Sequence, residues 1–186
     1  GSTGLVSIGF NLNFYGSNYS NLYVNNNGNT TFTGPLSTYT PFGITGVSTP
    51  MLAPFFADVD TRGAGSGLVQ YGQDTIGGRN VFGVNWINVG YFGAHVDKLN
   101  SFQLIVTDRS DVAAGDFDFE FNYDQIQWET GDASGGSGGL GGTSAAAGWT
   151  NGAGQYFEFT GSRVNGAFLN AGPNALISGS RNSQTA

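Results

Sequence analysis

The amino-acid sequence predicts an all-β fold, an antiparallel β-sandwich of about 8–10 short strands with long Gly/Asn-rich loops. Three observations support this prediction. Residues 116–123 alternate strictly between aromatic and polar side chains, which is the period of a half-buried strand. Other short apolar segments recur between clusters of Gly, Asn, Ser and Pro. No stretch longer than about six residues shows the 3.6-residue period of an amphipathic helix.

The segment 116–123 is the centre of the predicted core. One face carries four aromatic rings and the other carries polar side chains, namely Phe117, Phe119, Phe121 and Tyr123 against Asp116, Asp118, Glu120 and Asn122. Four rings on one face need a second sheet to cover them. The three carboxylates repel one another unless water or a cation lies between them. We expect a solvated outer face there, and a cation site is the alternative.

The expected strands are the periodic segments that lie between turn signals. In chain order they are Leu5–Tyr15, Leu22–Val24, Thr30–Thr33, Met51–Asp60, Leu68–Tyr71, Asn80–Val89, Ser101–Asp108, Asp116–Tyr123, Ala145–Trp149 and Gln155–Phe159. The Asn27-Gly28 pair predicts a hairpin turn between the second and third, because both residue types tolerate positive φ. Met51–Asp60 is the most apolar run, and it ends in two aspartates.

The expected loops are the segments in which the period is lost. Gly34–Thr49 is a long connection, pinned to the core by Pro41-Phe42 and Ile44. Asp74–Gly78 is expected to be a turn, and Gly90–Asn100 a loop that carries the only histidine, His95. Gly131–Gly142 has low complexity and is expected to be a loop.

Composition limits the possible partners and chemistries. The chain has 186 residues, 10% charged residues, a net charge of −7 and no cysteine. The acidic balance argues against nucleic acid or an anionic membrane as partner. The lack of cysteine excludes disulfides, thiol catalysis and Cys-based zinc sites. No apolar run approaches the roughly 18–20 residues that cross a bilayer as a helix.

The domain organisation is predicted to be simple. We expect one β domain over residues 5–170, preceded by leader or cloning residues 1–4. Residues 171–186 have weak structural signals and are expected to form a partly disordered C-terminal extension. No basic and apolar leader opens the chain, so a signal peptide, if the protein is secreted, has been removed.

Several motifs of mixed polar and aromatic character occur in one order along the chain. They are Phe14-Tyr15-Gly16, Leu22–Gly28 (LYVNNNG), Ala53–Asp60 (APFFADVD), Gly83–Val89 (GVNWINV), Leu99–Leu104 (LNSFQL) and Phe121–Gly136. From Gly9 to Leu169 the chain resembles the nidogen-like (NIDO) extracellular domain. The resemblance implies an extracellular, mostly β module of cell–matrix or cell–cell adhesion that is not catalytic. The absence of cysteine and the Asn/Gly-rich composition favour a bacterial secreted or surface adhesin.

Four acidic residues at strand ends are candidate calcium ligands. Asp58 and Asp60 are two residues apart at the end of a strand, and Glu129 and Asp132 lie at another strand end. Calcium takes six to eight oxygen ligands, often carboxylates from a short loop. The alternative is that Asp58 or Asp60 pairs with Arg62 or caps the turn. Calcium is the only cofactor that the sequence suggests.

A second candidate site would bind carbohydrate. Trp149, between Gly148 and a turn, is the tryptophan most expected to be exposed, whereas Trp86 and Trp128 lie on strands and fill the core. An exposed ring can stack on a sugar, and the amides of Asn25, Asn26 and Asn27 can bond its hydroxyl groups.

The sequence therefore predicts a non-enzymatic adhesion or matrix-interaction module of a larger surface or secreted protein. Its expected partners are extracellular matrix, a cell-surface protein or a glycan. The alternatives are a lectin-like carbohydrate-binding module and a self-associating structural spacer. An enzyme ranks last: Glu120 with Glu129 is the only carboxylate pair that could serve a glycosidase.

Overall fold

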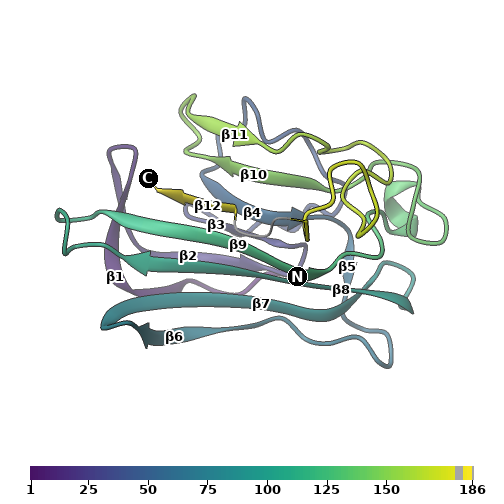
Figure 1. The fold of residues 1–186 in the computed structure, drawn as a ribbon, viewed down its shortest axis with the longest axis horizontal. Helices are drawn as coiled ribbons and strands as arrows, with labels where there is room; N and C mark the ends of the chain where they lie inside the picture. The colour runs from purple at the N-terminus through teal and green to yellow at the C-terminus, as the bar shows by residue number, and fades with distance from the viewer. Residues whose placement is uncertain (179–181, 186) are drawn as a thin grey trace.

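Two antiparallel sheets packed face to face make up the fold in the computed structural model, which describes residues 1–178 and 182–185 (Figure 1). The first sheet has the order β1-β2-β3-β4-β10-β11, with β1 at Val6–Phe14, β2 at Ser17–Asn25, β3 at Asn29–Thr31, β4 at Met51–Phe56, β10 at Ala146–Thr150 and β11 at Tyr156–Glu158. The second has the order β12-β9-β8-β7-β5, with β6 also paired to β7; β5 is Val59–Asp60, β6 Gln70–Ile76, β7 Arg79–Tyr91, β8 His95–Asp108, β9 Phe117–Gln125 and β12 Asn182–Thr185. The predicted all-β sandwich is confirmed.

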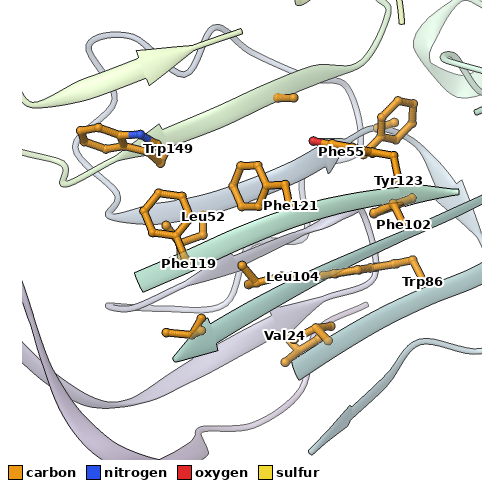
Figure 2. Close-up of a cluster of buried hydrophobic side chains, with 14 of the residues drawn as sticks. Val24, Leu52, Phe55, Trp86, Phe102, Leu104, Phe119, Phe121, Tyr123 and Trp149 are labelled. Atoms are coloured by element: carbon orange, nitrogen blue, oxygen red, sulfur yellow. The ribbon is translucent and has the colours of Figure 1, made fainter. Parts of the chain in front are cut away.

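The alternating segment forms β9, inside the second sheet, and its aromatic face is the core. Phe117, Phe119, Phe121 and Tyr123 are buried, and the residues between them are partly exposed. Figure 2 shows Phe119 and Phe121 of β9 pointing toward Leu52 of β4 in the opposite sheet. The Tyr123 hydroxyl donates a 2.8 Å hydrogen bond to the Pro54 carbonyl, which joins the two sheets directly.

The outer face of β9 confirms the expectation of a solvated acidic surface. Asp116, Asp118 and Glu120 are all partly exposed. Arg109, in the turn before β9, donates a 2.6 Å hydrogen bond to Asp118. One cation therefore offsets the repulsion within this row.

The most apolar run of the sequence, Met51–Asp60, forms two strands that belong to different sheets. β4 lies in the first sheet and β5 in the second, so the chain crosses between the layers at Ala57 and Asp58. All ten residues are buried because the run closes one end of the sandwich. Apolar and polar residues do not alternate along this run, because both of its sides are buried. The crossing places Asp58 and Asp60 at that end.

The Asn27-Gly28 turn joins β2 to β3, as predicted. Gly28 has φ +76°, and a Cβ atom there would lie 1.7 Å from the Phe55 carbonyl oxygen. The turn is held against β4 by hydrogen bonds from Phe55 N to Gly28 O and from Ala57 N to Asn27 O, both 3.2 Å. Only glycine permits this close approach.

Two segments predicted as a turn and a loop are instead strand. β6 continues to Ile76, so the turn is only Gly77-Gly78, and most of Gly90–Asn100 belongs to the β7–β8 hairpin. Every residue of β6 is exposed, and the first five residues of β8 are exposed or partly exposed. Strands whose residues stay exposed do not need alternating apolar residues, so their sequence carries no period of two.

The long connection between β3 and β4 is anchored in the core by residues that the sequence predicted for this role. Ile44 is fully buried, and Phe42 packs edge-on against Phe56 with ring centroids 4.9 Å apart.

In the expected C-terminal extension, Leu176 is buried in the main core. The disorder expected for residues 179–181 and 186 lies outside the described residues. Within the described chain, no helix has the length and apolar character to cross a membrane.

Candidate binding pocket

A pocket of about 400 Å³ opens at the end of the sandwich where the chain crosses between sheets. It is lined by segments from five connections and by β5, and its side chains include Asn26, Asn27, Tyr39, Asp58, Asp60, Arg62 and Phe92. Two of the predicted calcium ligands and two of the predicted sugar-binding amides thus lie around one cavity.

Asp58 is a buried carboxylate with little hydrogen bonding. Its side chain is 2% exposed. Oδ2 accepts one long hydrogen bond, 3.4 Å, from the Ser134 hydroxyl, and Oδ1 accepts none from residues 1–178. Burial, opposed by the Ser134 hydrogen bond and helped by the negative charges of Asp60 and Asp132, raises the pKa of Asp58 to about 6. Asp58 therefore has unused acceptor capacity in the pocket.

Asp60 has the opposite environment because all its acceptor capacity is used. Arg62 donates to it from Nε at 2.8 Å and Nη2 at 2.7 Å, and from its backbone N–H at 3.0 Å. The backbone N–H of Ala94 adds a fourth bond at 3.1 Å. These donors, Arg62 first, hold the pKa of Asp60 well below its usual range. The predicted alternative of a pair with Arg62 that also caps the turn is confirmed for Asp60.

Two aromatic rings form the rim of the pocket. Tyr39 and Phe92 are stacked with ring centroids 6.5 Å apart, and they are 48% and 37% exposed. The Arg62 guanidinium lies 5.4 Å from the centre of the Phe92 ring. Sequence analysis missed both rings, because each lies in a connection without a period that would show its direction.

The three consecutive asparagines have structural hydrogen bonds. Asn25 is fully buried, and its amide nitrogen donates to Asn29 at 2.8 Å and to Thr31 at 3.0 Å. Asn26 and Asn27 line the pocket, but their amide nitrogens donate to the carbonyls of Val59 and Thr38, both at 2.9 Å. Only Asn26 and Asn27 are placed where a ligand could reach them.

Glu129 and Asp132 do not line the pocket. Glu129 is buried and accepts hydrogen bonds from the backbone N–H groups of Gly166, at 2.5 Å, and Phe168, at 2.6 Å. Burial raises its pKa, and these donors oppose the shift. Asp132 Oδ2 accepts a 2.8 Å hydrogen bond from His95 Nε2. No group of three or more His, Cys, Asp or Glu side chains within the described chain is arranged to hold a metal ion.

Trp149 is in the core, contrary to the expectation of an exposed ring. It is 8% exposed and stacks on Tyr15 with ring centroids 5.2 Å apart. The expected strand Ala145–Trp149 forms β10, but all five residues of β10 are buried, so the turn that follows Trp149 does not expose its ring. Glu120 lies on the outer face of β9, and Glu129 is buried against a backbone turn, so the two carboxylates do not share the pocket.

Comparison with known proteins agrees with the fold and the motifs. The family model described as nidogen-like domain matches residues 20–77 and 71–175. The chain belongs to the nidogen-like domain family. It is 33% identical to alpha-tectorin of Mus musculus over 88% of this chain, and 30% identical to nidogen of Drosophila melanogaster over 90%. No solved structure gives a significant match.

The nidogen-like domain is a small part of these relatives. The matched region covers 8% of mouse alpha-tectorin and 14% of the fly nidogen. The matched region is therefore too small a part of these relatives to establish their activities and partners for this chain.

Proposed function

We propose that this nidogen-like domain is a non-enzymatic adhesion or matrix-interaction module, and that the Asp58 pocket is its contact site. It would act outside the cell, within a larger surface or secreted protein, on matrix, a cell-surface protein or a glycan. The observation that carries the proposal is the Asp58 carboxylate, which is buried in the pocket with one long hydrogen bond. A partner that supplies a cation or an N–H or O–H donor would satisfy it.

The surroundings of Asp58 support a binding role rather than a catalytic one. Its acidic neighbour Asp60 is fixed by four hydrogen bonds, so it is poorly suited to move a proton. The exposed rings of Tyr39 and Phe92 offer a partner apolar area beside the polar floor. Aromatic rings that become buried when a partner binds contribute much of the free energy of protein association.

Surface binding tests the proposal. The wild-type domain should bind to immobilised matrix preparations or to cells, and Asp58→Asn and Tyr39→Ala should each weaken binding about tenfold or more. The matched control is Asp124→Asn, which removes a carboxylate from an exposed position of β9. Equal loss in the control would mean that general acidity, and not the pocket, drives binding. Binding that both pocket variants retain in full would contradict the proposed site.

A lectin-like function is the second candidate, because stacked rings and two amides surround one cavity. Sugar rings pack on such aromatic faces, and amides bond their hydroxyl groups. A glycan array separates the candidates: hits that vanish in Tyr39→Ala support the lectin. An array without hits, alongside retained binding to protein preparations, excludes it.

Calcium stays a prediction, now limited to Asp58, because Arg62 and Ala94 occupy the acceptor sites of Asp60. A ligand that binds only the folded state raises the melting temperature by mass action. If calcium binds, millimolar calcium should raise the melting temperature of the chelator-treated domain by several degrees, and Asp58→Asn should abolish this increase. No shift in the wild type at millimolar calcium would remove the metal from the proposal.

A further inference from the structure

The strand β6 forms an open border of the second sheet. It pairs with β7 through seven consecutive residues without any shift in register. Among the described residues no strand pairs with its other side, and it runs along the lower border in Figure 1. All seven residues are exposed. The backbone N–H and C=O groups on this side are therefore available to another strand.

This border lacks the features by which proteins block unwanted pairing. Natural edge strands are shortened, bulged, or protected by Lys or Pro. β6 contains neither Lys nor Pro, and its one charged residue is Asp74. Exposed apolar side chains occur on it and just before it, with Leu68 70%, Tyr71 47% and Ile76 57% exposed. The border is thus suited to pairing.

The other open borders are less suited to pairing. At the outer edge of the first sheet, β1 has an irregular register between Ser7 and Leu12. At the far edge of the first sheet, β11 has three residues. At the far edge of the second sheet, β12 has four residues, and β5, which pairs with β7 beyond β6, has two. A regular seven-residue edge offers the longest ladder of hydrogen bonds among these.

We propose that β6 pairs antiparallel with β6 of a second copy of this domain, about a two-fold axis through Gln73. The two second sheets would then join into one continuous sheet across the interface. A two-fold contact of this kind is closed, so it gives a dimer rather than a fibre.

The β6 sequence is compatible with itself in this register. Tyr71 lies opposite Thr75 of the second copy, and aromatic residues pair favourably with β-branched ones. Asp74 lies opposite Gly72 of the second copy, so no like charges face each other. Ile76 lies opposite Gln70. Every pair joins residues on the same face of the sheet, because the paired numbers differ by an even amount.

The neighbouring register centred on Asp74 is less favourable. A shift that moves the axis to Asp74 places the two Asp74 carboxylates directly opposite each other, which is destabilising. A shift of one residue in the pairing would place Tyr71 on the face opposite to its partner. The self-matching sequence is the reason to choose a second copy over an unrelated extended segment.

Sedimentation and light scattering over a range of concentrations test the dimer. The wild-type domain should show a reversible monomer–dimer equilibrium. Tyr71→Lys with Ile76→Lys should weaken the dimer at least tenfold, because Lys on an edge opposes pairing. The matched control is Val112→Lys, an apolar residue 64% exposed in the β8–β9 turn. Circular dichroism and melting temperature would verify that each variant is folded.

Cysteine trapping tests the register, and the chain contains no cysteine to interfere. Gln73→Cys should form an intermolecular disulfide under mild oxidation, because it lies on the axis. Thr75→Cys alone should not, whereas Tyr71→Cys with Thr75→Cys should. A concentration-independent monomer overturns the proposal. So does a dimer that the Lys variant leaves intact, or a monomer whose β6 instead captures an extended peptide of another protein.

Discussion

Replacing Asp58 by Asn is expected to stabilise the fold at pH 7 while weakening binding. The carboxylate has its pKa raised from 3.8 to about 6, chiefly by burial, so its ionised form is costly in the folded state. A difference of about 2 units corresponds to about 3 kcal/mol as an upper limit. We therefore expect the free energy of unfolding to rise by about 1–3 kcal/mol.

The pH dependence has a defined sign. The folded state holds a proton on Asp58 between pH 4 and pH 6 that the unfolded state has lost, so this group lowers stability as the pH rises through that interval. The gain in Asp58→Asn should be small near pH 4 and reach its full value above pH 6. Urea denaturation of both proteins at several pH values measures it. A gain that is independent of pH, or a loss at pH 7, would contradict the assignment.

Glu129→Gln is the matched control, since Glu129 is also a buried carboxylate. Both of its oxygens accept backbone hydrogen bonds, from Gly166 and Phe168. An amide has only one acceptor oxygen, so one backbone N–H would face an NH₂ group. This variant should lose about 1–3 kcal/mol. The free energy of unfolding should therefore rise in Asp58→Asn and fall in Glu129→Gln. This difference would distinguish a carboxylate with few hydrogen bonds from one that holds a loop in place.

A residue that reduces stability and lies in a pocket is consistent with selection for binding. Functional sites often keep groups that the fold alone would not favour. Asp60 does not have this property, because hydrogen bonds from Arg62 hold its pKa low. Burial also raises the pKa of Glu129, but both of its oxygens are hydrogen-bonded within the domain. Asp58 is thus the one of the four predicted acidic ligands that lines the pocket and keeps acceptor capacity for a partner.

The sequence predicted the interior of the fold well because burial imposes a pattern. The period of two along β9 and the central part of β7 followed directly from one covered face and one solvated face. The Asn27-Gly28 turn could be predicted because the positive φ at Gly28 restricts the residue type there. The assignment of Met51–Asp60 to a single strand was less successful, because a fully buried run has no period that reveals a crossing between sheets.

The pocket was only partly predictable. Asp58 and Asp60 stood out as paired carboxylates at the end of an apolar run, and the structure brings them together with Asn26 and Asn27. Tyr39 and Phe92 could not be predicted as rim residues, because their positions depend on how distant connections meet. Glu129 was grouped with Asp58 on charge and strand position, and its true partners lie in a loop almost forty residues later in the chain.

Replacing Phe121 by Ala is expected to cause the largest loss of stability among these changes. Phe121 is fully buried on β9, opposite Leu104 of β8. Its ring lies 5.4 Å from Phe119 and 6.0 Å from Phe159, centroid to centroid, so it joins the core of both sheets. Removal of a buried phenyl ring costs about 3–5 kcal/mol, through lost burial and the cavity that remains.

The adjacent residue Glu120 provides a control on the same strand. It lies on the outer, partly exposed face, so Glu120→Ala should change the free energy of unfolding by less than about 0.5 kcal/mol. Chemical denaturation of both variants, with an unchanged m-value, would show that only the stability differs. Because alternate residues of a strand face opposite sides, neighbouring positions should differ by several kcal/mol. Similar losses at both positions would mean that β9 does not separate a covered face from a solvated one, and the sandwich built on that separation would be wrong.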